Sequence, residues 1–328
     1  MKVFILGAGS IGGFVGARLA RAGAQVTYLA RGATLAALRA RGLTLIEDGV
    51  ERTSPAAAVE RAEDAGAQDV VILAVKAHQL AGALRGFGAL LHADTMVVPM
   101  QNGIPFWYFQ RHGGAHDGRR VAAVDPEGAI SATIEPRRIV GCVVYPACEI
   151  VAPGVIRHVE GERFPLGELD GALTPRARAL AALFEAGALK APLLADIRNE
   201  LWLKLWGNLA FNPISALTRA PLDRICAEGA TRGLAAQMMR EAQAVAEALG
   251  VRFRLPLERR IEGASRVGAH KTSMLQDVEA GRETEIEALV GAVIELARLS
   301  ATPVPSLEAL HACVKLLSAG PALERRAA

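Results

Sequence analysis

The chain has 328 residues, of which 51% are hydrophobic and 22% charged, and its formal charge is +3. This balance is typical of a globular protein long enough for two domains, and it gives no support for a nucleic-acid or membrane-surface partner. No apolar run reaches the length of a membrane span. Four cysteines without paired metal spacing indicate a reducing, cytoplasmic setting.

The N-terminal half alternates short β-rich runs with amphipathic helices. Residues 2–6, 25–30, 69–75 and 95–100 predict strands, and residues 11–22 predict the first helix. From about residue 138 the pattern predicts strands joined by turns, then a helix from about residue 175 and a short strand at 189–195. The first part therefore predicts an α/β domain with helices on both faces of a parallel sheet.

From residue 196 onward only helical periodicity is present. It is interrupted at Pro213, near Pro256, at Gly281 and at residues 301–306. We therefore divide the chain into an α/β domain of residues 1–195 and an all-α domain of residues 196–328.

A glycine-rich loop follows the first predicted strand and opens the first helix. In the segment GAGSIG, Gly7 permits a tight turn, Gly9 lets a pyrophosphate approach the backbone, and Gly12 lets helix and strand pack closely. A glycine-rich turn without ligand is the alternative, but this context predicts a Rossmann-type dinucleotide site. We expect the whole loop to contact the cofactor: Gly7, Ala8, Gly9, Ser10, Ile11 and Gly12.

The second predicted strand ends in YLARG, where a site for NAD usually carries an acidic residue. Here Arg31 stands at that place with no acid nearby, and a guanidinium suits a 2′-phosphate. The sequence therefore predicts NADPH rather than NADH, with a solvated surface arginine as the alternative.

The next two predicted strands are also followed by polar residues. Lys76 and Gln79 follow one, and Asn102 follows the other within QNG. Ligands bind at the carboxyl ends of strands in open α/β sheets. We expect Lys76 and Gln79 to contact the cofactor and Asn102 to reach its nicotinamide end, although Asn-Gly is also an ordinary turn pair.

The segment ELWLKLWGNLAFNP, residues 200–213, is almost wholly apolar, but Lys204, Asn208 and Asn212 interrupt it at spacings of four. On an α-helix this spacing places the three polar residues on one narrow stripe. Because buried polar groups need partners, the stripe indicates a face toward a ligand. A lysine that reaches solvent beside ordinary helix amides is the alternative.

Taken together, these segments resemble the ketopantoate reductase family (2-dehydropantoate 2-reductases). The resemblance covers nearly the whole chain, in family order: GAGSIGG, Arg31, VKAHQ, QNG, ELWLKLWGNLAFNP, TSMLQD and TEIE. It implies a Rossmann domain followed by a helical domain, with the active site in the cleft between them. It also implies NADPH-dependent reduction of 2-dehydropantoate to pantoate in pantothenate and coenzyme A biosynthesis.

The resemblance also implies residue roles. Lys204 matches the lysine that polarises the ketone and supplies a proton to the alkoxide. Ser273 can donate to the carboxylate of a 2-oxo acid, and Glu285 can accept from a substrate hydroxyl. We therefore expect Lys204 and Glu285 to be catalytic, and the following residues to bind substrate: Asn102, Asn208, Asn212 and Ser273.

Two features depart from the family pattern. Leu222 stands where better-known members have an asparagine, with Arg219 three residues before it, so one amide contact to substrate is in question. Residues 104–138 are longer and more aromatic than usual, with consecutive aromatic residues at 106–109. These rings either pack on the α/β domain or at a subunit contact, or they line the substrate end of the cleft.

The same segment contains His112, His116 and Asp117, which have the residue types of metal ligands. Two glycines separate the histidines and no third ligand is convincing, so we expect a surface loop and no metal site.

Two other functions are compatible with these residues. One is the same chemistry on another, bulkier 2-oxo acid, and the other is an NADPH-binding protein without turnover. The joint presence of Lys204, Ser273 and Glu285 argues against the second. We expect a small-molecule 2-oxo acid substrate and no nucleic-acid or membrane partner, and the oligomeric state stays open, with a homodimer as one option.

Overall fold

The computed structural model describes residues 1–327, and the side chains of residues 1–319. The chain forms two compact units, which we describe one at a time. The first unit contains Met1–Gln101, Phe106–Arg120 and Glu127–Ile197, and the second contains Asn102–Pro105, Val121–Pro126 and the chain from Arg198 onward. Two short segments from the first 195 residues therefore pack with the helical unit.

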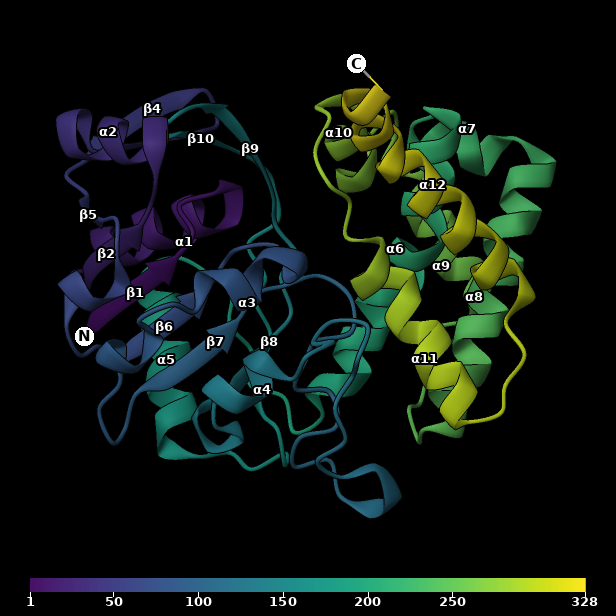
Figure 1. Ribbon diagram of the computed structural model, residues 1–328, viewed down its shortest axis with the longest axis horizontal. Coiled ribbons are helices and arrows are strands. Elements are labelled where there is room, and N and C mark those ends of the chain that lie inside the picture. Colours follow the sequence, from purple (N-terminus) through teal and green to yellow (C-terminus); the bar gives the residue numbers. More distant parts are fainter. Residues whose placement is uncertain (328) are drawn as a thin grey trace. The chain divides into compact units, whose positions relative to one another are not determined.

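A five-stranded parallel sheet forms the centre of the first unit, in the order β5-β2-β1-β6-β7 (Figure 1). Both β6 and β7 are buried along their whole length, because helices and further strands cover both faces of the sheet. The predicted α/β fold and four of its strands are confirmed. The strands are β1 (Lys2–Leu6), β2 (Gln25–Leu29), β5 (Ala57–Val59), β6 (Val70–Leu73) and β7 (Met96–Pro99).

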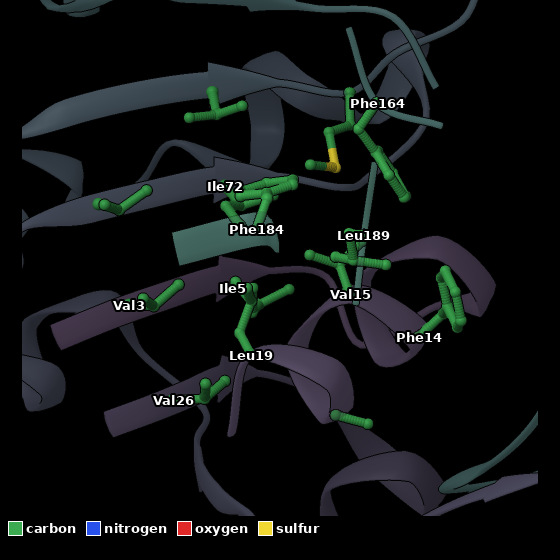
Figure 2. Packing of buried hydrophobic residues seen from close by; sticks show 14 of the residues in the cluster. Val3, Ile5, Phe14, Val15, Leu19, Val26, Ile72, Phe164, Phe184 and Leu189 are labelled. Atoms are coloured by element: carbon green, nitrogen blue, oxygen red, sulfur yellow. The ribbon is translucent and has the colours of Figure 1, made fainter. Parts of the chain in front are cut away.

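The core of this unit lies between the sheet and its first helix, α1 (Ser10–Arg21). Figure 2 shows Val15 and Leu19 of α1 beside Ile5 of β1, and all three side chains are fully buried. Phe184, from α5 (Pro175–Ala186), joins the same cluster. The apolar side of α1 thus holds the glycine loop that precedes it against the sheet.

Two smaller sheets complete the first unit. One has the order β4-β3-β10-β9 and the other pairs β11 with β8. The strands and turn predicted after residue 138 are confirmed. The bounds are β3 (Leu43–Glu47), β4 (Val50–Ser54), β8 (Val140–Cys142), β9 (Ala147–Ala152), β10 (Val155–Glu160) and β11 (Leu166–Glu168), with short helices α2 (Gly32–Arg41), α3 (Leu80–Ala83) and α4 (Ala129–Thr133).

The strand predicted at residues 189–195 is wrong. Only isolated bridges form there, from Lys190 to Arg163 and from Leu193 to Leu166. Pro192 accepts a hydrogen bond from Leu166 through its carbonyl, but it has no N–H to donate, so a continuous ladder cannot form.

The second unit is built from helices, coloured green to yellow in Figure 1. Its core includes the fully buried indole of Trp206, whose Nε1 donates to the carbonyl of Met239 at 2.7 Å. The predicted interruptions near Pro256, at Gly281 and at 301–306 are confirmed. The helices are α6 (Ile197–Thr218), α7 (Leu222–Ala227), α8 (Gly229–Ala248), α9 (Leu257–Ser265), α10 (Ser273–Glu279), a π-helical turn at Glu287–Gly291, α11 (Ala292–Leu299) and α12 (Pro305–Ala327). None of the described helices is both long and apolar enough to cross a membrane.

The interruption predicted at Pro213 is also wrong, because α6 continues through it to Thr218. A proline inside a helix removes one hydrogen bond and crowds the carbonyl four residues earlier. Packing offsets this cost here, since Ile214, Ser215 and Ala216 are at most 2% exposed. The Ser215 hydroxyl also donates to the carbonyl of Ala220 at 2.7 Å. As a result Asn212 stays in helical register with Lys204.

Candidate active site

The glycine loop has the geometry expected of a dinucleotide site. Gly7 has a φ of +109°, and a Cβ there would lie 2.7 Å from Cγ1 of Val75. A Cβ on Gly12 would lie 2.0 Å from the carbonyl oxygen of Gly7, so only glycine permits this approach of α1 to its loop. By contrast, a Cβ on Gly9 would meet no atom within 4 Å, so the space above that backbone is open.

The amino end of α1 is suited to an anion. Gly9 is its N-cap residue and supplies no side-chain cap to the first N–H groups of the helix. The first turn contains no acidic residue. The positive end of the helix dipole and the uncapped N–H groups beside open space fit a pyrophosphate.

Three of the other residues expected to bind cofactor lie at the same carboxyl edge of the parallel sheet, whereas Asn102, expected at the nicotinamide end, belongs to the second unit. Arg31 is exposed, two residues after the end of β2, and is the N-cap residue of α2. Lys76 and Gln79 follow β6, and the Lys76 backbone N–H donates to Oε1 of Gln79 at 3.4 Å. These positions suit binding of the adenosine phosphates, with Arg31 available for a 2′-phosphate. We call this group of residues in the first unit the nucleotide cluster.

Gln101 also belongs to this edge, although the sequence suggested no role for it. Its Nε2 donates to the carbonyls of Leu73 at 2.8 Å and Val75 at 2.9 Å. These two bonds tie the end of β7 to the loop after β6, which carries Lys76. The position of QNG at the end of a predicted strand was the sequence signal available for Gln101, but it applied equally to Asn102.

A second cluster lies wholly within the helical unit. Lys204, on α6, donates from Nζ to Oδ1 of Asn102 at 2.5 Å. Asn102 in turn donates from Nδ2 to Oε2 of Glu285 at 3.5 Å. The amide therefore bridges an ammonium and a carboxylate, with its acceptor toward the cation and its donor toward the anion. We call Lys204, Asn102 and Glu285 the lysine cluster.

Two further predicted residues, Asn212 on α6 and Ser273 on α10, are in contact with each other. Asn212, which is 6% exposed, donates from Nδ2 to Oγ of Ser273 at 3.5 Å. Ser273 is exposed at the first turn of α10, where Thr272 caps the helix by accepting from the N–H of Leu275. Asn208 is half-buried on the same stripe as Lys204 and Asn212. The stripe thus carries an ammonium and amides that could contact a carboxylate or a hydroxyl.

Charge is also balanced just beyond Glu285, in the π-helical turn. Glu287 accepts from Nε2 of His311 at 3.1 Å and pairs with Nζ of Lys315 at 2.8 Å. These contacts, the one with His311 above all, lower the pKa of Glu287 to about 2. The carboxylate therefore stays ionised in this ion-pair network and links the turn to α12.

The residues that depart from the family pattern lie outside the lysine cluster. Leu222 is half-buried at the start of α7, and its backbone N–H donates to the carbonyl of His270. Arg219 is exposed, in a left-handed conformation with a φ of +61°. Neither position supplies an amide side chain.

The aromatic run packs in the first unit. Phe106, Trp107, Tyr108 and Phe109 are at most 3% exposed. The Trp107 ring lies against Gly141, where an added Cβ would be 3.0 Å from it, and Phe109 contacts Tyr108 edge-on. The packing interpretation of this run is therefore the one that the structure supports.

The histidines after this run pack against Phe109 too. The ring centroids of His112 and His116 lie 5.4 and 5.5 Å from that of Phe109. Asp117 accepts from the backbone N–H of His112 at 2.8 Å, so its carboxylate closes the loop. Among residues 1–319, no group of three or more acidic, histidine or cysteine side chains could hold a metal ion.

Comparison with protein families matches both parts of the chain. Residues 3–171 match the model of ketopantoate reductase PanE/ApbA, and residues 196–318 match the model of the C-terminal part of the same enzymes.

Individual relatives match over nearly the full length. A protein of Mesorhizobium japonicum named 2-dehydropantoate 2-reductase is 54% identical over 97% of this chain and 98% of its own. A crystal structure from Ralstonia solanacearum is 42% identical, covers 97% of each chain and has a TM-score of 0.93. A D-mandelate dehydrogenase solved with NADH and anilino(oxo)acetate shares the fold, with a TM-score of 0.82 at 21% identity over 97% of this chain and 98% of its own.

Proposed function

Because the chain belongs to the ketopantoate reductase family, we propose that it reduces 2-dehydropantoate (ketopantoate) to pantoate with NADPH. This reaction would serve pantothenate and coenzyme A biosynthesis in the cytoplasm. The single observation that carries the proposal is the lysine cluster, in which one amide holds an ammonium and a carboxylate on either side of it.

The proposed chemistry divides between the two units. We assign cofactor binding to the first unit and proton transfer and substrate binding to the second. When bound, the reduced nicotinamide supplies the hydride that adds to C2 of the 2-oxo acid. Lys204 donates a hydrogen bond to the ketone oxygen and then transfers a proton to it, so that the product is a neutral alcohol. Water returns a proton to the amine afterwards.

The remaining residues orient the substrate in this proposal. Asn102 holds the ammonium of Lys204 by accepting a hydrogen bond from one of its three N–H groups. Glu285 accepts from the C4 hydroxyl of 2-dehydropantoate, and Ser273 donates to its carboxylate with Asn212 beside it. Asn208 contributes a further amide on the same face of α6.

The preference for NADPH rests on Arg31. Its guanidinium is exposed after β2, and no acidic residue stands there to accept from a ribose 2′-hydroxyl. A guanidinium can instead bind a 2′-phosphate through charge-assisted hydrogen bonds.

Reduction of a bulkier 2-oxo acid receives no support from the aromatic run, because those rings are buried in the first unit. An NADPH-binding protein without turnover would not need the lysine cluster. Whether the purified chain forms a homodimer is tested by its mass in solution, measured by light scattering.

The test is NADPH oxidation with a panel of matched 2-oxo acids. One member is 3,3-dimethyl-2-oxobutanoate, which differs from 2-dehydropantoate only by lacking the C4 hydroxyl, and another is phenylglyoxylate. We expect kcat/KM to be about 10- to 100-fold higher for 2-dehydropantoate, since a hydrogen bond to a charged group is worth about 1.5–3 kcal/mol. In Glu285→Ala this advantage should disappear. Faster reduction of phenylglyoxylate, or no turnover of any member, would overturn the proposal.

A further inference from the structure

The turn that carries Asn102 rests directly on the π-helical turn of the second unit. The backbone N–H of Ile104 donates to the carbonyl of Ala288 at 2.8 Å. Ala288 lies in the π-helical turn Glu287–Gly291, three residues after Glu285 in the sequence. Asn102 and Glu285 are therefore fixed to each other through the backbone as well as through their side chains.

Gly103 makes this contact sterically possible. Its φ is +86°, and a Cβ there would lie 2.2 Å from the carbonyl oxygen and 2.9 Å from the Cβ of Ala288. Real Cβ atoms do not approach backbone oxygen so closely, so any side chain would force the turn away from the helix. Because Ala288 is 2% exposed and packed in the core, the displaced segment would be the turn with Asn102.

The helix of the second unit departs from α-helical geometry at this contact, because Ala288 lies in the π-helical turn. A π-helical turn contains one extra residue, and such turns occur often at functional sites. Here the turn presents the Ala288 carbonyl to a segment from far away in the chain.

We propose that Gly103 is a positioning residue, which lets the turn lie on Ala288 and so holds Asn102 between Lys204 and Glu285. This inference rests on the proposed function. A displacement of a catalytic group by about 1 Å can lower the rate about 10²-fold, so the effect of moving Asn102 should be measurable.

A glycine with positive φ can also be required for backbone conformation alone. Gly250 supplies the matched control, since its φ is +89° and a Cβ there would meet no atom within 4 Å. Both alanine variants carry a similar conformational strain, but only Gly103→Ala pushes against Ala288.

The experiment compares these two variants in the full chain, alone and combined with Asn102→Ala. We expect Gly103→Ala to lower kcat for 2-dehydropantoate about 10- to 100-fold relative to Gly250→Ala. In the Asn102→Ala background, Gly103→Ala should cause no further loss, because the group that it positions is already absent. If Gly103→Ala does not fold, Ala288→Val crowds the same contact from the helix and should behave likewise.

If the wild type turns over 2-dehydropantoate normally, two results would overturn this inference and leave the proposed function standing. One is a kcat of Gly103→Ala, or of Ala288→Val where that variant replaces it, within twofold of Gly250→Ala. The other is a loss of kcat on Gly103→Ala that is equally large in the wild-type and Asn102→Ala backgrounds, which would show that Gly103 acts through general stability. Absence of wild-type turnover of 2-dehydropantoate would instead overturn the proposed function, and this inference with it.

Discussion

In the proposed function, Lys204 is the proton donor, and its ammonium contacts Asn102. We predict that Lys204→Ala lowers kcat about 10²–10⁴-fold, because the general acid is lost. NADPH should still bind, since the nucleotide cluster lies in the other unit. The measurements are steady-state kinetics and a fluorescence titration with NADPH.

Lys204→Arg is the matched control, because arginine keeps the charge but does not release its proton. We expect it to remain nearly as slow as the alanine variant. A near-normal rate in Lys204→Ala would contradict the role of proton donor.

Arg31 should determine cofactor preference at the residue scale. We predict that Arg31→Ala raises the KM for NADPH about 10- to 100-fold, through loss of a charge-assisted contact, and leaves the KM for NADH nearly unchanged. Arg41→Ala removes the same charge from the opposite end of α2 and serves as control. A wild-type preference for NADH, or equal effects of the two variants, would show that Arg31 does not bind the 2′-phosphate.

At the scale of elements, the aromatic run is a packing element of the first unit. Trp107 and Phe109 are 1% and 0% exposed, so we predict that each alanine variant loses about 3–5 kcal/mol of unfolding free energy. The ratio of kcat/KM for 2-dehydropantoate and phenylglyoxylate should stay at its wild-type value. Urea unfolding and kinetics test this, and a changed ratio in a folded variant would place a ring at the substrate.

The link between the π-helical turn and α12 should depend on pH. Because the pKa of Glu287 is lowered to about 2, chiefly by His311, its contribution to stability is present above the ordinary pKa of glutamate. It is lost as the pH falls from about 4.5 toward 2, where the unfolded chain and then the folded chain take up a proton.

We therefore predict that wild type is more stable than Glu287→Gln at pH 6 and that the difference shrinks below pH of about 4.5. The Glu287 side chain is 42% exposed, so water screens both pairs and the difference should not exceed about 1 kcal/mol. Urea unfolding at several pH values measures it. A difference that grows on acidification would contradict the assignment.

At the scale of the whole molecule, the helical unit depends on segments from the N-terminal half of the chain. Glu295 accepts from the backbone N–H groups of Ala122 and Ala123 at 2.9 and 2.7 Å, and Ala288 accepts from Ile104. We predict that a fragment starting at Arg198 is less stable than the same helices in the full chain, because hydrogen bonds to a charged group contribute about 1.5–3 kcal/mol. Circular dichroism on heating tests this, with the intact chain as control. A fragment that melts cooperatively at the same temperature would refute it.

The sequence predicted most of the local structure and part of the site. Strands β1, β2, β6 and β7 and the glycine loop were visible because strand periodicity and glycine chemistry act over a few residues. It predicted no element for residues 32–59, where α2 and three short strands form, two of them with little burial to mark them.

The amino-acid sequence by itself determined that Lys204, Asn208 and Asn212 share one face of a helix, because the helical period depends only on the local backbone. Only the tertiary structure decided that α6 continues through Pro213, where packing outweighs the proline's lost hydrogen bond. It also decided that Asn102, 102 residues from Lys204, lies 2.5 Å from its ammonium. Contacts between such distant segments depend on how whole elements pack, and no local pattern of residues records them.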